Sequence, residues 1–101
     1  MSNCFQLFRN GETEPSNLDD IDSELCKELG IEVHAKYWCF GWFDTIGFSL
    51  ACGKSFADIR NSLSKQIAES TDEYWTNRLE NLLSIAEYLG DNYSASAWAE
   101  R

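Results

Sequence analysis

Three consecutive residues, Gly53-Lys54-Ser55, are of the types that end a phosphate-binding loop. In such a loop the backbone amides, the lysine and the hydroxyl surround the phosphates. The loop also needs a second glycine five residues before the glycine that precedes the lysine. Phe48 occupies that position here, in a stretch typical of a helix. We therefore predict no nucleotide site. We interpret the three residues as a helix end, a linker lysine and a serine that caps the next helix.

Nucleophilic catalysis and metal binding also lack the residues that they need. His34 is the only histidine, and no serine stands in a Gly-x-Ser-x-Gly elbow. The cysteines are Cys4, Cys26, Cys39 and Cys52, with no Cys-x-x-Cys pair and none at zinc-finger spacing from His34. We expect no enzyme activity, no catalytic residue, no cofactor and no metal site.

One carboxylate stands in an otherwise apolar segment. Asp44 lies between Gly41 and Cys52, where an unpaired buried charge would be costly. It either bonds a backbone amide near a helix start, pairs with a lysine or arginine, or faces outward at a partner site. Structural pairing is the favoured alternative, because a catalytic carboxylate would need a second acid that the sequence does not place.

The uneven charge of the chain is its strongest functional feature. The net charge is −9 at pH 7, and residues 12–32 hold eight acids against Lys27 alone, a net −7 within 21 residues. Such a field repels nucleic acid and anionic membranes and attracts basic surfaces. The alternative is that the acids only keep a small protein soluble.

Much of this charge falls on a predicted helix over residues 18–29. Leu18, Ile21, Leu25 and Leu29 make one apolar stripe, Asn17 caps the start and Gly30 follows the end. Three acids share another face, about 6 Å apart along the helix axis. A DNA strand carries one phosphate per 3.4 Å of axis, so the face has about half that charge density. Nucleic-acid mimicry and a merely solvated face are both open. The three acids are Asp20, Glu24 and Glu28.

An uncharged aromatic cluster over residues 37–43 is the second feature. Core packing is the default for such residues, but seven consecutive large side chains cannot all face one interior. Exposed rings beside an acidic rim would suit an interface hot spot. From the two features together we predict a partner-binding surface made of Glu12, Glu14, Asp19, Asp20, Glu24, Glu28, Glu32, Trp38, Phe40 and Trp42.

The chain of 101 residues is long enough for one compact domain, and we predict a mostly helical α+β fold. A short N-terminal β-hairpin over residues 4–9 and 12–14, turning at Asn10-Gly11, is joined by a possible third strand at residues 31–34. About four helices cover residues 18–29, 41–52, 55–68 and 71–89. The helix over 41–52 is apolar on nearly all sides and is expected to be central and buried.

The ends of the last helix have their own signals. Ser70 and Glu73 have capping-box spacing, and Gly90 is expected to end the helix. Residues 91–101 either pack back through Tyr93 and Trp98 or pack loosely. The residues that we predict to form the core are Ile21, Leu25, Trp42, Ile46, Leu50, Ile59, Leu63, Leu79, Leu82 and Ala86.

The start of the chain lacks a signal-peptide pattern, and no apolar run approaches the roughly 20 residues that span a bilayer. We expect a cytoplasmic protein in a bacterial host cell, with four free and mostly buried thiols.

The profile of small size, acidity and aromatic content is similar to that of two functional groups. These are phage-encoded anti-defence proteins, such as anti-CRISPR and anti-restriction inhibitors, and immunity proteins that neutralise bacterial nuclease toxins. Both groups contain unrelated folds, so no residue roles carry over. The first is our leading hypothesis, an inhibitor of a basic protein that is a nucleic-acid-binding complex or nuclease. The alternatives are an immunity protein and a self-associating assembly protein. We expect no direct nucleic-acid or membrane partner, and a homodimer is possible.

Overall fold

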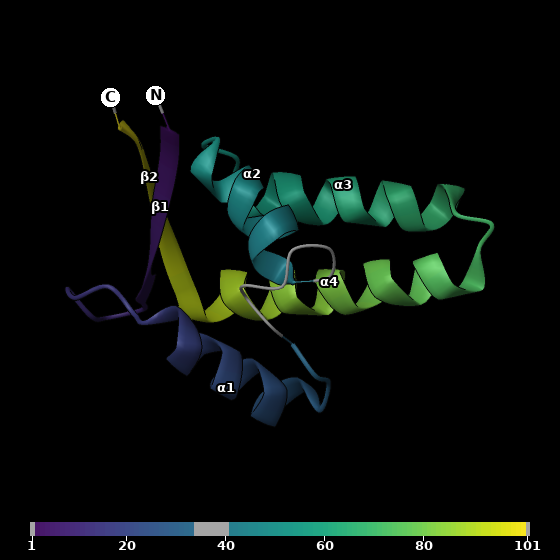
Figure 1. Cartoon of the computed structure of the whole chain (residues 1–101), viewed down its shortest axis with the longest axis horizontal. Coiled ribbons are helices and arrows are strands. Elements are labelled where there is room, and N and C mark those ends of the chain that lie inside the picture. The colour runs from purple at the N-terminus through teal and green to yellow at the C-terminus, as the bar shows by residue number, and fades with distance from the viewer. Residues whose placement is uncertain (1, 34–40, 101) are drawn as a thin grey trace.

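The computed structural model describes residues 2–33 and 41–100, and it confirms a mostly helical α+β fold. In Figure 1 the helices α3 and α4 lie side by side, α1 lies along the other side of α4, and a two-stranded ribbon stands at one end. The elements in chain order are β1 (Ser2–Arg9), α1 (Leu18–Leu29), η1 (Phe43–Gly47), α2 (Phe48–Ala51), α3 (Phe56–Glu69), α4 (Glu73–Asn92) and β2 (Tyr93–Glu100).

Helix α1 has the bounds that its sequence predicts, because both of its ends carry local signals. The Asn17 side chain accepts the N–H of Asp19 at 2.8 Å, which satisfies one of the amides left open at a helix start. Gly30 has a φ of 67° and ends the helix in the left-handed conformation. Ile21 and Leu25 are buried on the predicted stripe.

Helix α3 begins as predicted, whereas both predicted ends of α4 are wrong. Ser55 and Asp58 form a capping box at the start of α3. The cap of α4 is Asp72, whose carboxylate accepts the N–H of Trp75, rather than a box between Ser70 and Glu73.

Gly90 lies inside α4, which runs on to Asn92. A Cβ at Gly90 would lie 3.2 Å from the Cβ of Phe56. The glycine is therefore explained by the close approach of α3, not by the end of a helix.

The segment predicted as a buried helix over residues 41–52 is helical but not buried on all sides. A π-helical turn, η1, leads into the single α-helical turn of α2. Trp42, Ile46 and Leu50 recur every four residues and are buried. Phe48 is 67% exposed. The segment thus has more large apolar side chains than can be buried on its one face toward the core.

The N-terminal strand is confirmed, but its partner is β2 rather than residues 12–14. The two strands pair antiparallel over their whole length, from Ser2 opposite Glu100 to Arg9 opposite Tyr93. Of the two alternatives for the C-terminal segment, packing back is the one observed, because the segment completes α4, forms half of the sheet and buries Tyr93.

The predicted turn exists even though the hairpin does not. The carbonyl of Arg9 accepts the N–H of Glu12 at 2.9 Å, and Gly11 has a φ of 88°. Residues 12–14 are exposed and offer no apolar side chain to bury, so a return strand there would gain little. Residues 31–33 belong to no strand, and His34 lies outside the described residues.

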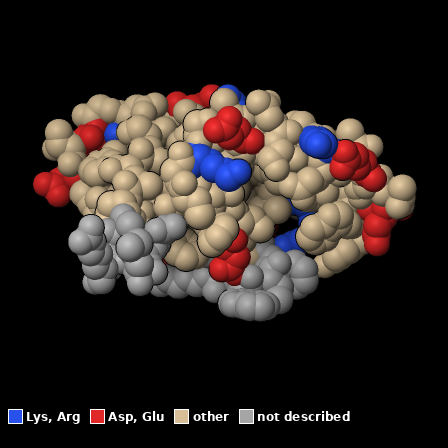
Figure 2. Space-filling view, turned by 90° about the horizontal axis from the view of Figure 1, so that it is seen from above, with Lys and Arg blue, Asp and Glu red and all other residues tan. Residues whose placement is uncertain are grey.

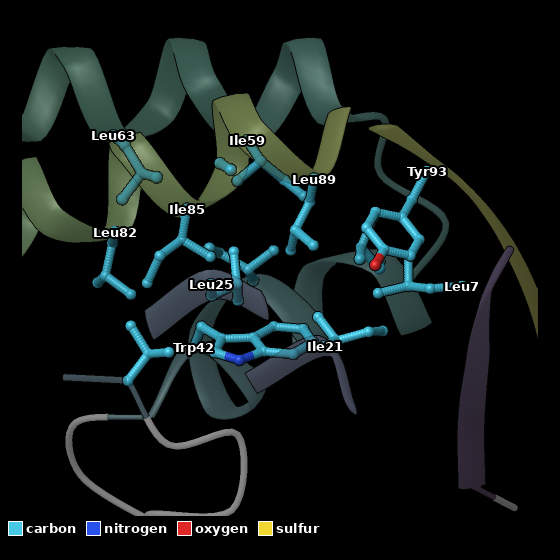
Figure 3. Close-up of a cluster of buried hydrophobic side chains, with 14 of the residues drawn as sticks. Leu7, Ile21, Leu25, Trp42, Ile59, Leu63, Leu82, Ile85, Leu89 and Tyr93 are labelled. Carbon is cyan, nitrogen blue, oxygen red and sulfur yellow. The ribbon is translucent and has the colours of Figure 1, made fainter. Parts of the chain in front are cut away.

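All ten residues predicted for the core are buried, with between 0 and 9% of their surface exposed. Figure 3 shows side chains from α1, α3 and α4 directed at one interior that also contains the Trp42 ring. Five further apolar residues complete the core, namely Leu7, Val33, Ile85, Leu89 and Tyr93.

Candidate partner-binding surface

The acidic segment of residues 12–32 remains largely at the surface. Six of its eight acids are exposed, together with its one base, Lys27. Figure 2 shows the face of the molecule above α2 and α3, where acids and bases are interspersed. The excess of acid belongs to α1 and its flanking loops, because residues 12–32 hold eight acids and one base, and α1 lies on the opposite side of the molecule from α3 in Figure 1. The exposed acids are Glu12, Glu14, Asp19, Asp20, Glu28 and Glu32.

Glu24, which the sequence places on the acidic binding face, instead joins four elements of the fold. Its carboxylate accepts hydrogen bonds from Arg9 of β1, Tyr93 of β2 and Tyr88 of α4. Arg9 also donates to the Tyr93 hydroxyl at 2.9 Å and lies over the Tyr93 ring, 5.1 Å from its centroid. Only 20% of the Glu24 side chain is exposed, and its carboxylate bonds to groups within the fold.

The contacts of Glu24 determine its protonation. Burial alone would raise its pKa, but the hydrogen bonds from Arg9, Tyr88 and Tyr93 outweigh burial and lower the pKa to about 2. Burial and the hydrogen bond to Glu24 raise the pKa of Tyr88 to about 12 and also raise the pKa of Tyr93. Groups that titrate so far from neutral pH are poorly suited to general acid–base catalysis. The cluster links α1 to β1, α4 and β2 through these hydrogen bonds.

The removal of Glu24 from the surface weakens the case for nucleic-acid mimicry. Asp20 and Glu28 remain on the outer face of α1, eight residues apart, or about 12 Å along the axis. Phosphates on one DNA strand follow one another every 3.4 Å of axis. The face therefore attracts basic groups without reproducing the spacing of a phosphate backbone.

Of the three aromatic residues predicted at the interface, Trp42 is in the core. It is 1% exposed, and its indole N–H donates to the Asp22 carboxylate at 2.7 Å. Trp42 is therefore not exposed to a partner in this structure, because its ring is part of the core together with residues of α1 and α4. Trp38 and Phe40 lie outside the described residues.

Two other rings, Phe43 and Phe48, are exposed in their place. They are 37% and 67% exposed, and the N–H of Phe48 bonds to the carbonyl of Phe43 across the π-helical turn. In a π turn the backbone hydrogen bond joins residues that are five apart, which brings them closer to the same face of the helix. In an ideal α-helix, residues five apart are rotated about 140° from each other. The only signal in the sequence that could have found them is the surplus of aromatic residues.

These rings border an apolar groove between β1, the start of α1 and the η1–α2 segment. Its volume is about 440 Å³, within the range of sites that bind small molecules or single protein side chains. The ring centroids of Phe5 and Phe43 lie 5.4 Å apart. A Cβ at Gly47 would lie 3.0 Å from the Phe5 ring, so the glycine lets that ring approach. The groove is lined by Cys4, Phe5, Leu18, Phe43, Asp44, Gly47, Phe48 and Ala51.

Asp44 lies on the rim of this groove, and it is exposed. Among the described residues it forms no ion pair and no side-chain hydrogen bond, so the structural pairing that we favoured from the sequence is not observed there. The remaining alternative, a carboxylate that faces outward at an interface, agrees with its position.

The Gly53-Lys54-Ser55 segment is a helix connection, as predicted. Gly53 has a φ of 87°, and the Ser55 hydroxyl accepts the N–H of Asp58 at 3.1 Å. The structure describes three of the four cysteines, and the expectation that they are mostly buried is wrong for these three. Cys4 and Cys26 are half-buried and Cys52 is exposed.

Residues 2–33 and 41–100 contain neither a metal-binding cluster nor a helix that could span a membrane. No group of three His, Cys, Asp or Glu side chains gathers closely enough there to hold a metal ion. In the same residues, no helix combines the length and the apolar character that crossing a bilayer requires.

Comparison of the chain with protein-family models, with curated proteins and with solved structures finds no match.

Proposed function

We propose that this protein binds a basic nucleic-acid-handling protein and inhibits it by covering its nucleic-acid site. The observation that carries the proposal is the continuity between the apolar groove and the acidic helix. Leu18 lines the groove and is the first residue of α1, and the exposed Asp19 and Asp20 follow it directly. An apolar anchor with a charged rim is therefore present on one side of the fold.

The two parts of this surface do different work in the proposed complex. Apolar groups that are fully desolvated at the centre of an interface supply most of the affinity. Charges at the rim accelerate association and select partners of the opposite charge. The groove, with Phe43 and Phe48 beside it, takes the first part, and the exposed acids of residues 12–32 take the second.

The test is capture of bacterial proteins on the immobilised chain at low and high salt, followed by competition with DNA and RNA. The proposal expects a nuclease or another nucleic-acid-binding complex that is released by nucleic acid. Its association rate should fall as salt rises, because screening shortens the range of the rim charges. A captured defence complex would indicate the anti-defence form, and a captured toxin would indicate an immunity protein.

Two pairs of variants test the two parts of the surface. One pair distinguishes the acids of the rim from acids elsewhere on the protein, and the other distinguishes an aromatic ring at the groove from an exposed ring elsewhere. Glu12→Gln/Asp20→Asn/Glu28→Gln removes three rim acids, and the control Glu69→Gln/Glu80→Gln/Glu87→Gln removes three exposed acids from α3 and α4. Only the first set should slow association. Capture that ignores salt, rim acids and competing nucleic acid alike would refute the proposal.

The groove pair replaces one exposed ring in each variant. Phe48→Ser acts at the groove, whereas Tyr74→Ser acts on a ring that is 62% exposed and not part of the groove lining. The first should accelerate dissociation of the captured complex at least tenfold, and the second should leave dissociation within about twofold of the unchanged protein. Equal effects would remove the groove from the proposed interface.

A further inference from the structure

The hydrogen bonds around the ribbon show which backbone groups of β2 face away from β1. In an antiparallel pair, the N–H and C=O of successive residues point alternately toward the partner strand and away from it. The N–H of Asn10 bonds to the carbonyl of Asn92, so Phe8 and Ser94 face each other across the ladder. Ser96, opposite Gln6, also points inward. The alternation therefore directs the backbone groups of Ala95 and Ala97 outward.

Two independent hydrogen bonds agree with this alternation. The carbonyl of Leu7, which should point away from β2, accepts the N–H of Ser16 at 2.8 Å. The N–H of Tyr93, which should point away from β1, bonds to the carbonyl of Leu89. The outer edge of β1 is thus occupied at its centre by the segment before α1.

The outer edge of β2 has no such cover within residues 2–33 and 41–100. No backbone or side-chain hydrogen bond of the described residues reaches the outward groups of Ala95 or Ala97, and both side chains are exposed. In Figure 1 the ribbon stands at one end of the molecule, with α2 in contact with both of its strands. A row of open donors and acceptors is a template for another strand.

β2 also lacks the features by which proteins usually block an edge. Residues 93–99, Tyr-Ser-Ala-Ser-Ala-Trp-Ala, contain no charge and no proline. The register with β1 is continuous over eight pairs, so no bulge turns the strand away. Four of the five residues 94–98 are serine or alanine, which allows another backbone to approach closely.

We propose that β2 is a dimerisation edge, and that its occupant is β2 of a second copy. Two copies related by a two-fold axis near Ser96 would pair their β2 strands antiparallel and form a four-stranded sheet. Antiparallel self-pairing joins the outward groups of Ala95 and Ala97 to those of the second copy and closes the assembly. The uncharged strand permits this occupant, because two β2 strands can pair over residues 93–99 without opposing acids even though each chain has a net charge of −9. The outer edge of β1, which is also free of acids, is already bonded at Leu7 by Ser16.

The direct test follows amide hydrogen exchange and sedimentation over a range of protein concentrations. As dimer forms, the amides of Ala95 and Ala97 should become at least tenfold more protected, whereas those of Ser94 and Ser96 should be protected in monomer and dimer alike. Dimerisation should strengthen as salt screens the two like-charged bodies. Capture of the basic partner should instead weaken as salt rises. Because salt acts in opposite directions on dimerisation and on partner capture, the failure of one proposal can be distinguished from the failure of the other.

Matched variants assign the effect to the edge. Ser96→Lys places a charge on β2 near the axis in both copies, and should raise the dimer dissociation constant at least tenfold. Gln6→Lys, opposite Ser96 on β1, the outer strand of the proposed sheet, makes the same change in charge and should alter that constant less than twofold. Ala97→Pro removes an outward N–H that the ladder with β1 does not use, and should also abolish the dimer.

Three results would overturn the assignment. The first is a monomer at high micromolar concentration in high salt. The second is a dimer that leaves the exchange of Ala95 and Ala97 unchanged. The third is a dimer that protects the amides of Gly47 and Phe48 instead, which would move the contact to the apolar groove.

Discussion

The indole N–H of Trp42 donates a hydrogen bond to the carboxylate of Asp22, with 2.7 Å between Nε1 and Oδ1. Trp42 is buried, and Asp22 comes from the acidic helix α1. One acid of the charged segment therefore holds the segment before η1 against α1. A buried indole without an acceptor would lose the hydrogen bonds that it makes with water in the unfolded chain.

The first prediction concerns this contact. Asp22→Ala should lower the free energy of unfolding by about 1–3 kcal/mol, because it leaves the indole N–H without its acceptor. Asp22→Asn keeps a side-chain oxygen and should cost clearly less. Urea unfolding followed by tryptophan fluorescence measures both. If Asp22→Ala and Asp22→Asn lower the free energy of unfolding equally, the negative charge of Asp22 stabilises the fold rather than its ability to accept a hydrogen bond.

The second prediction concerns Glu24, where three donors from β1, α4 and β2 converge. Glu24→Gln should cost about 2 kcal/mol, within the range for hydrogen bonds to a charged group. Glu28→Gln changes the net charge equally at an exposed position of the same helix and should cost less than about 0.5 kcal/mol. If the two variants unfold at the same urea concentration, the Glu24 cluster does not stabilise the fold.

The third prediction is a dependence of stability on pH. The pKa of Glu24 is lowered from 4.5 to about 2, so its stabilisation is present above about pH 4.5 and is lost as the pH falls toward 2. The difference in unfolding free energy between the unchanged protein and Glu24→Gln should therefore shrink through this window. A constant difference in urea unfolding across the window would contradict the lowered pKa.

At alkaline pH the stability changes with pH in the opposite direction, so that it falls as the pH rises. The pKa of Tyr88 is raised from 10.0 to about 12, because the folded state holds its proton more tightly. Its contribution is present below about pH 10 and is lost as the pH rises through 12. Tyr88→Phe should remove this part of the alkaline loss, and urea unfolding at a series of alkaline pH values measures it. An unchanged alkaline slope in that variant would contradict the raised pKa.

The fourth prediction concerns the core between α3 and α4. Leu63→Ala and Leu82→Ala should each cost about 2–5 kcal/mol, because both side chains are buried and the cavity would not close fully. A loss of this size can unfold a domain this small. Leu83→Ala, at a half-buried position of α4, should cost less and serves as the control. Thermal unfolding measures the three variants. If all three had melting temperatures close to that of the unchanged protein, the packing of Leu63 and Leu82 in the core would be contradicted.

The sequence by itself determined the features that depend on neighbouring residues. The bounds of α1 follow from Asn17 and Gly30, whose side-chain oxygen and left-handed backbone act within one turn of the helix. The burial of Ile59, Leu63 and Leu79 follows from periodicity, because a helix with an apolar stripe must turn it toward the interior.

The tertiary structure alone decided which distant residues meet. Arg9 and Tyr93 stand 84 residues apart, and they pair because α4 returns the chain to its start, which no local pattern encodes. Glu24 shares its helix face with Asp20 and Glu28, yet only Glu24 lies where β1, α4 and β2 converge. Helix periodicity specifies the face of a side chain but not what packs against that face. The distinction between an acid that binds a partner and one that holds the fold together therefore arises only when the elements assemble.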